Sequence, residues 1–132
     1  MADVSITLPG RPEVVSQVRR WTTTTLGCDV PGVDLVVLVA SELATNAIVH
    51  TASGEPGGTF TLHLATHEDR WEIRVEDAGG PKRPVVTSAE AEDAGGRGLA
   101  VVSMLAKEWG VAGSQEARSV WAQVAFPELT YG

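Results

Sequence analysis

The sequence is poor in cysteine and has no long apolar run. Its one cysteine, Cys28, excludes an internal disulfide and cannot form a metal site alone. The longest apolar run, Leu35–Ala40, is far too short to cross a bilayer. The first residues, Met1-Ala2-Asp3-Val4, lack the basic and apolar pattern of a secretory signal. We therefore expect a cytoplasmic protein that does not contact the membrane.

Basic residues are also in deficit, and the formal net charge is −7. This balance disfavours direct binding to nucleic acid, because such binding depends on Lys and Arg contacts to phosphate. An acidic chain better suits a protein partner, or a small ligand whose phosphates are bound by local donors and a metal. With 132 residues and no internal repeat or linker, we expect a single domain over residues 1–132.

Apolar residues recur at strand spacing in some stretches and at helix spacing in others. Alternation predicts strands near residues 4–8, 60–64, 71–77, 109–111 and 118–126. Helical spacing predicts helices over residues 12–26, from Pro31-Gly32 to about Thr51-Ala52, and after the glycines at 95–98. Pro12 suits a first helical turn, and Gly27 is expected to end the first helix.

The central predicted helix carries three polar residues four positions apart, Glu42, Asn46 and His50. Residues at this spacing share one helix face. Nearly all the other residues of the helix are apolar, so we expect it to be buried. A buried carboxylate, amide and imidazole cost several kcal/mol unless partners satisfy them. The three residues therefore face a polar cavity or bond to neighbouring backbone, and we favour the cavity.

Strand parity places one carboxylate on the core side of the sheet. Side chains alternate along a strand, so Asp77 falls on the same face as Trp71, Ile73 and Val75. Gly79-Gly80-Pro81 follows and leaves space for a ligand against the backbone. An Asp before two glycines is most often turn chemistry, so this signal alone is weak.

Between Pro81 and Gly96, apolar residues follow neither strand spacing nor helix spacing. This predicts a mobile loop. Gly95-Gly96-Arg97-Gly98 then opens a helix, where free N–H groups and the helix dipole favour an anion. Leu99 begins an apolar stripe on this helix, and we expect that stripe to be part of the hydrophobic core. Each feature has a plain structural explanation, and His50 alone suits a core or helix-end residue better than a ligand. Together and in this order they indicate a nucleotide site.

Two common nucleotide motifs are absent. The sequence has no Gly-x-x-x-x-Gly-Lys-Ser/Thr loop, and its glycines do not follow the first strand as in a dinucleotide-binding turn.

Three segments resemble the GHKL, or Bergerat-fold, ATPases, the group that holds histidine kinases, gyrase B and MutL. Residues 42–50 (Glu-Leu-Ala-Thr-Asn-Ala-Ile-Val-His) resemble the N box, residues 75–79 the first glycine box, and residues 96–99 the second. The small size and the Glu-x-x-x-Asn-Ala-x-x-His pattern are similar to the anti-sigma-factor serine kinase branch. Trp109-Gly110 and Val120-Trp121 are similar to stand-alone actinobacterial ATP-binding regulators. The resemblance covers nearly the whole chain.

The resemblance implies an α+β fold, a two-layer sandwich in which about three helices cover one face of a mostly antiparallel sheet of about five strands. It implies that Glu42 is the catalytic base and that Asn46 binds Mg²⁺, a cation that prefers hard oxygen ligands. Asp77 would accept a hydrogen bond from the adenine amino group. The remaining ATP-binding residues that it implies are His50, Gly79, Gly96, Arg97, Gly98 and Leu99, with an ATP lid over about residues 80–97.

The function implied is an ATP–Mg²⁺-dependent protein serine/threonine kinase that regulates transcription. It would phosphorylate an antagonist protein, sequester a sigma factor, and form a homodimer. Two alternatives use the same fold: a non-catalytic, nucleotide-gated interaction module, and a simple ATPase. The chain departs from the family where many relatives carry a Gly-Thr pair, because it has Ala117-Arg118-Ser119 there. Without that threonine, the resemblance does not imply a water-mediated hydroxyl contact to adenine, and it assigns no role to Arg118.

Overall fold

The computed structural model describes residues 3–78, 94–113 and 118–127; for His50, Ala52 and residues 94–98 it describes only the backbone. Within these ranges, five antiparallel strands form one sheet in the order β1-β2-β3-β5-β4. The strands are β1 (Asp3–Pro9), β2 (Thr59–Thr66), β3 (Arg70–Asp77), β4 (Glu108–Gly113) and β5 (Arg118–Ala125).

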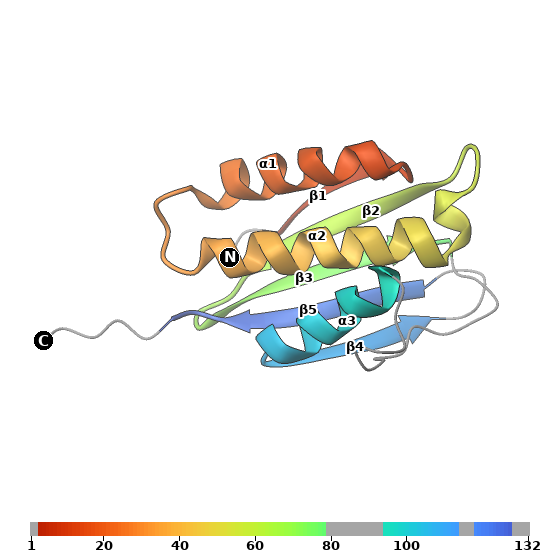
Figure 1. The fold of residues 1–132 in the computed structure, drawn as a ribbon. Helices are drawn as coiled ribbons and strands as arrows, with labels where there is room; N and C mark the ends of the chain where they lie inside the picture. The colour runs from red at the N-terminus through yellow and green to blue at the C-terminus, as the bar shows by residue number, and fades with distance from the viewer. Residues whose placement is uncertain (1–2, 79–93, 114–117, 128–132) are drawn as a thin grey trace, which may run out of the picture.

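Helices cover one face of this sheet (Figure 1). They are α1 (Val15–Leu26), α2 (Val33–His50) and α3 (Ala94–Leu105), with short 3-10 turns η1 (Pro12–Val14) and η2 (Ala52–Gly54). The predicted two-layer α+β sandwich is confirmed. The predicted strands and helices are all present, and the first turn of the helix expected from Pro12 is a 3-10 turn.

Two glycines with positive φ fix the connection between α1 and α2. Gly27 ends α1 at φ 101°, and its N–H donates to the Thr23 carbonyl at 2.8 Å. Gly32, at φ 89°, precedes the first residue of α2. A Cβ atom at Gly32 would lie 2.8 Å from Cδ of Pro127, so the start of α2 and the end of the sheet pack closely there. Glycine is required at both positions because other residues rarely adopt this conformation.

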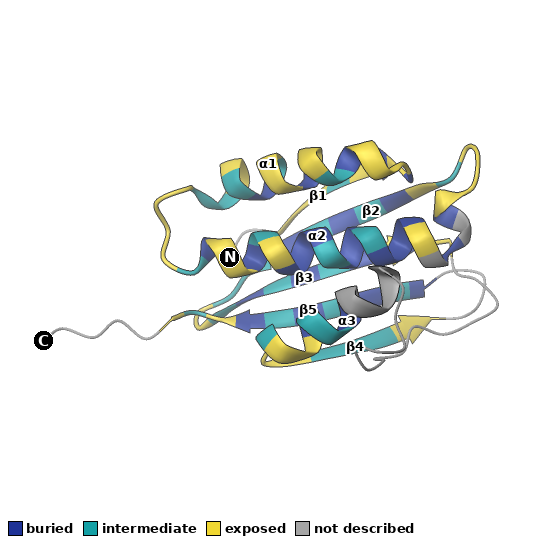
Figure 2. Cartoon of the chain, in the orientation of Figure 1, coloured by how far each residue is buried: buried dark blue, intermediate teal, exposed yellow. Residues whose placement is uncertain are grey.

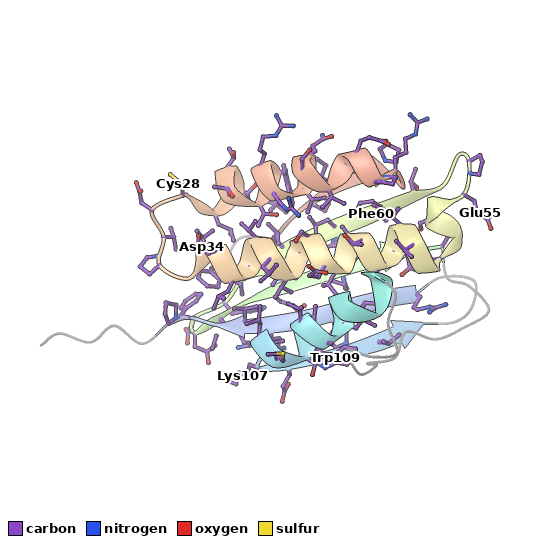
Figure 3. The ribbon with its side chains drawn as sticks, in the orientation of Figure 1. Cys28, Asp34, Glu55, Phe60, Lys107 and Trp109 are labelled. Carbon is purple, nitrogen blue, oxygen red and sulfur yellow. The ribbon has the colours of Figure 1, made fainter. Side chains whose placement is uncertain are left out.

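The core lies between the helices and the inner face of the sheet (Figure 2). The alternation along β2, β3 and β5 places every second side chain in this layer. The largest fully buried side chains come from both layers: Phe60, Leu43, Leu62, Ile73, Leu99, Val18, Val36, Val39, Val75, Val102, Val120 and Val124. Figure 3 labels Phe60 on β2 within this layer, and Cys28 in the exposed loop after α1.

The expectation that α2 is buried all round is wrong. Leu35, Leu38 and Val49 are exposed, at 38%, 40% and 52%. The helix packs on the sheet with one side and between α1 and α3 with its flanks, so its outer side faces solvent. The hydrophobic sequence of α2 therefore overstates its burial.

The other face of the sheet is polar where β3 and β5 meet. Glu72, Arg74 and Gln123 point away from the core, together with the indole of Trp121. A Cβ atom at Gly110 would lie 2.8 Å from this indole, so the glycine of β4 makes room for it. Among the residues that the structure describes, no helix is both long enough and apolar enough to span a bilayer.

Candidate functional site

The chain turns away from α2 through two buried hydroxyl residues. Thr51 follows the helix in an extended conformation, and its Oγ1 donates to the Ala47 carbonyl at 2.7 Å. The same oxygen accepts a hydrogen bond from the Ser53 N–H at 3.0 Å. Ser53 is fully buried. One hydroxyl thus joins the last turn of α2 to the turn that follows it.

The Ser53 side chain extends this connection to the sheet. Its Oγ accepts a hydrogen bond of 2.8 Å from the N–H of Ala78, the residue after Asp77. The end of β3 is therefore bonded to the segment after α2, although the two are 25 residues apart in sequence. Asp77 is held by this bond at the end of the molecule where α2 ends.

Two glycines allow this close packing. A Cβ atom at Gly54 would lie 1.8 Å from the Ile48 carbonyl oxygen, and one at Gly10 would lie 1.8 Å from the Ser53 carbonyl oxygen. Backbone occupies the space that any other side chain needs at both positions. Sequence reasoning missed these glycines and the two hydroxyls, because residues 51–58 resemble an ordinary turn. The signal available was a Thr and a Ser directly after the helix, where such residues often bond to backbone.

Asn46 lies on the inner side of α2, one turn before its end. It is 2% exposed, and its Nδ2 has no hydrogen-bond partner among the described residues. A buried amide with an unpartnered end is costly and calls for an explanation. Rotation of the carboxamide by half a turn exchanges the positions of its oxygen and its nitrogen. The side chain can therefore accept a hydrogen bond from a polar ligand or donate one to it. The observation fits the predicted contact to a nucleotide and its metal.

Glu42 occupies a different environment from Asn46. It is only partly buried, and burial raises the pKa of its carboxyl above the ordinary value of 4.5, whereas Arg19 of α1 opposes the rise. Glu42 and Asn46 are four residues apart on α2, but Asn46 is buried and Glu42 lies nearer to solvent. The predicted polar line through Glu42, Asn46 and His50 stays a prediction. A four-residue step turns the helix a further 40° or so, enough to move Glu42 toward the solvent side.

Asp77 is buried on the core face, as strand parity predicts, with 7% exposure. Its register partner on β5 is Arg118, which is 4% exposed. The inner face of the sheet thus ends in a carboxylate and a guanidinium on adjacent strands. Each of these two residues has an interaction partner within the folded protein.

Several predicted site residues lie outside the described residues or directly beside them. Gly79 and residues 80–93 of the predicted lid lie outside the described residues, and so does the His50 side chain. Gly96, Arg97 and Gly98 lie in the first turns of α3, so the lid predicted to reach residue 97 overlaps that helix. Leu99 is 2% exposed and belongs to the core cluster. The roles of these residues in binding stay predictions.

A metal would depend on few protein ligands. Within the described ranges there is no group of three or more His, Cys, Asp or Glu side chains arranged to hold a metal ion. Mg²⁺ is commonly bound by one or two side chains together with substrate phosphates and water. The single candidate among the predicted ligands is Asn46, whose buried side-chain oxygen is of the type that fits this mode.

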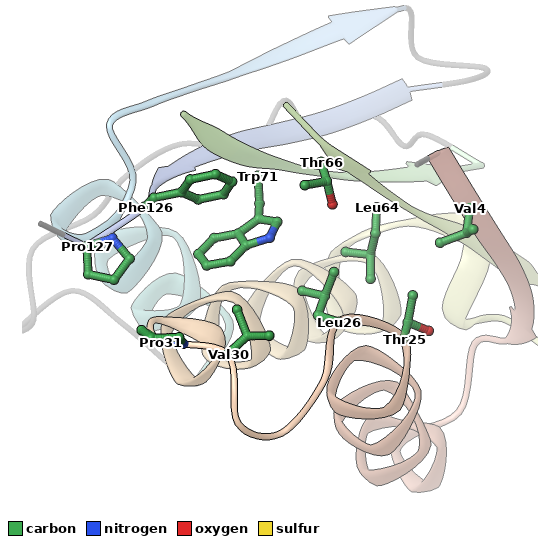
Figure 4. A pocket seen from close by; sticks show the side chains of 10 residues that line it. All are labelled: Val4, Thr25, Leu26, Val30, Pro31, Leu64, Thr66, Trp71, Phe126 and Pro127. Carbon is green, nitrogen blue, oxygen red and sulfur yellow. The ribbon is translucent and has the colours of Figure 1, made fainter. Parts of the chain in front are cut away.

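A separate apolar groove of about 380 Å³ lies at the other end of α2 (Figure 4). Figure 4 shows side chains from β1, α1, the loop before α2, β2, β3 and the segment after β5 around it. Its residues are Val4, Thr25, Leu26, Val30, Pro31, Leu64, Thr66, Trp71, Phe126 and Pro127. The 18 residues of α2, about 27 Å long at 1.5 Å per residue, separate this groove from Asp77.

The chain belongs to the histidine kinase-like ATPase domain family, whose model matches residues 8–124. It is also similar to the serine-protein kinase RsbW of Listeria monocytogenes and of Listeria innocua. Each is 30% identical over 79 residues, which cover 58% of this chain and 50% of the relative. The similarity thus spans about half the length of these curated relatives.

Proposed function

We propose that this protein is an ATP–Mg²⁺-dependent serine/threonine kinase of the anti-sigma type. The observation that carries the proposal is the end of α2. There the buried Asn46, whose Nδ2 has no partner among the described residues, and the buried carboxylate of Asp77 occur within a histidine kinase-like ATPase fold. The similarity to the serine-protein kinase RsbW supports a protein hydroxyl as the acceptor.

Asp77 would bind the base end of the nucleotide. Its carboxylate closes the apolar inner stripe of β3 and is held in place through the Ala78–Ser53 hydrogen bond. A hydrogen bond from the adenine amino group to this buried carboxylate contributes about 1.5–3 kcal/mol. Gly79, the next glycine along the chain, would let the base approach the backbone.

Asn46 would act at the phosphate end. Its side-chain oxygen is a hard ligand of the kind that Mg²⁺ prefers, and the bound cation would neutralise charge on the phosphates. Gly96 and Gly98, with Arg97 between them, would offer N–H groups and a positive charge to the same phosphates at the start of α3.

Glu42 would be the general base. Burial raises the pKa of its carboxyl, which makes the carboxylate more basic. The charge of Arg19 lowers this pKa and so offsets part of the rise. The acceptor hydroxyl oxygen forms its bond to the γ-phosphorus as the bond to the β-phosphate oxygen breaks. The hydroxyl proton passes to Glu42, and ADP leaves. Partial exposure of Glu42 on the outer side of α2 is compatible with access by a protein hydroxyl.

The partners we propose are an antagonist protein that carries the acceptor hydroxyl and a sigma factor that the protein sequesters. We also propose that the kinase acts in the cytoplasm as a homodimer. These proposals rest on the resemblance of the N box and glycine boxes, and on the similarity to RsbW over part of the chain. The net charge of −7 suits protein partners better than nucleic acid.

The test is transfer of label from [γ-³²P]ATP to a Ser or Thr of a candidate antagonist protein. Loss of a general base slows such a step by about 10²–10⁴-fold, so Glu42→Gln should transfer label at least a hundredfold more slowly. Glu13→Gln, on the exposed turn before α1, is the control and should not slow transfer. Nucleotide binding without transfer would replace the kinase with a nucleotide-gated interaction module, and phosphate release without an acceptor would replace it with an ATPase.

A further inference from the structure

Arg118 is a buried cation that the proposed mechanism leaves unused. It is the first residue of β5, it is 4% exposed, and it lies on the face that also carries Val120, Ala122 and Val124. Arginine is rarely buried to this extent unless it is paired. Its place in the fold therefore needs a specific reason.

The position of Asp77 explains part of the burial of Arg118. The two residues are the last register pair of β3 and β5, so their Cα atoms are about 4.5–5.5 Å apart, as in any antiparallel pair. Neither lacks a partner in the folded protein. A guanidinium has five N–H donors, and a carboxylate accepts about four hydrogen bonds. A single partner uses only part of either group.

The position of the pair points to a ligand rather than to the core. The preceding inner residues of both strands, Val75 and Val120, are apolar and buried. The two charges follow at the end of the ladder, beside the turn in which Ser53 binds Ala78. Buried charged groups add little stability compared with apolar residues of similar volume. A carboxylate and a guanidinium at this edge offer an acceptor and a donor side by side.

We propose that Arg118 reads the nucleobase together with Asp77, an inference that rests on the proposed function. Adenine presents an amino group flanked by ring nitrogens, N1 on one side and N7 on the other, which act only as acceptors. Asp77 accepts a hydrogen bond from the amino group, and Arg118 donates one to a flanking ring nitrogen. Arg118 is thus a specificity-determining residue for adenine nucleotides.

The experiment measures the dissociation constants of ADP, 1-deaza-ADP and 7-deaza-ADP by calorimetry, for the wild-type protein and for Arg118→Met. Each analogue lacks one of the two ring acceptors. We expect the wild type to bind one analogue about tenfold more weakly than ADP, the size of one hydrogen bond to a charged donor. Arg118→Met should bind ADP about tenfold more weakly and should bind that analogue as well as it binds ADP.

Arg74→Met is the matched control. Arg74 lies on the same sheet but on its outer face, opposite Trp121, and its side chain is 41% exposed. This variant should keep the analogue penalty of the wild type. If Arg118→Met does not fold, Arg118→Lys replaces it. Lysine keeps a positive charge beside Asp77, but its side chain is shorter and lacks the planar guanidinium group with its several N–H donors. The analogue penalty should then shrink.

An analogue penalty that is absent from the wild type, or the same in the Arg118 variant, would overturn the role of Arg118 while leaving ADP binding intact. Failure of the wild type to bind ADP at all would instead overturn the proposed function, and the inference with it.

Discussion

The two ends of α2 are built from different kinds of contact. Before the helix, Val30 and Pro31 face an apolar groove beside Trp71 and Phe126, whose rings meet edge to face at a centroid distance of 4.6 Å. After the helix, directional hydrogen bonds of 2.8 and 3.0 Å join Thr51, Ser53 and Ala78, and a bond of 2.7 Å joins Thr51 to Ala47. Apolar packing tolerates small shifts, whereas these bonds fix positions. A site that must place Asp77 accurately is expected at the second end.

The largest effect should come from filling the tightly packed end. In Gly54→Ala, the new Cβ would lie 1.8 Å from the Ile48 carbonyl oxygen, so backbone must move. We expect a loss of about 3 kcal/mol or more in the free energy of unfolding, measured by urea denaturation. Gly57→Ala is the control: φ is 82° there, but nothing lies within 4 Å. It should cost about 1–2 kcal/mol. Equal losses would refute the close packing at Gly54.

A pair of buried threonines tests whether hydrogen bonds hold that end together. Thr51→Val removes the donor to Ala47 and the acceptor for the Ser53 N–H, whereas Thr22→Val removes only a bond to the Val18 carbonyl within α1. Valine keeps the shape of threonine, so the hydroxyl alone changes. We expect Thr51→Val to lower the free energy of unfolding by about 1–3 kcal/mol, and Thr22→Val to change it by less than about 0.5 kcal/mol. A reversed order in urea denaturation would contradict this account.

The groove end should affect stability without affecting the nucleotide. Phe126→Leu removes the edge-to-face contact with Trp71, which contributes about 0.5–1.5 kcal/mol. Thermal unfolding should show that loss. Calorimetry with ADP and Mg²⁺ should give the wild-type dissociation constant, because α2 separates the groove from Asp77. A dissociation constant raised tenfold would place the groove in the nucleotide site.

The smallest effect concerns the charge of Glu42. Burial raises the pKa of its carboxyl, so the folded protein keeps this proton to a higher pH than the unfolded chain does. The ionised form then costs stability, and that cost appears as pH rises from the unfolded value near 4.5 through the raised pKa. Glu42→Gln should therefore be more stable than the wild type at pH 7 by roughly a few tenths of a kcal/mol, given the partial exposure. The difference should vanish below pH 4.5; urea denaturation across this range decides it.

Sequence alone predicted the elements because each carries a local signal. Alternation in Trp71, Ile73, Val75 and Asp77 predicted both a strand and the burial of its last carboxylate, and Gly27 predicted where α1 ends. The same reasoning overstated the burial of α2. Composition shows how apolar a helix is, but only the arrangement of neighbours shows which side they cover.

The supports of the site were not predictable from sequence. The bond from Ala78 to Ser53 joins segments 25 residues apart, and no local pattern indicates it. The pairing of Asp77 with Arg118 depends on the β3–β5 register and on the sheet order, in which β5 lies between β3 and β4. Long-range register of this kind is set by the whole sheet rather than by the residues involved.

The most direct test of the nucleotide site is a calorimetric titration of the wild type and of Asp77→Asn with ADP and Mg²⁺. Asp69→Asn, in the turn between β2 and β3, serves as the control, because the Asp69 side chain is 63% exposed. We expect one nucleotide per chain in the wild type and in Asp69→Asn, and binding at least tenfold weaker in Asp77→Asn. A wild type that binds no nucleotide, or an Asp77→Asn protein that binds it as tightly as the wild type, would contradict the account.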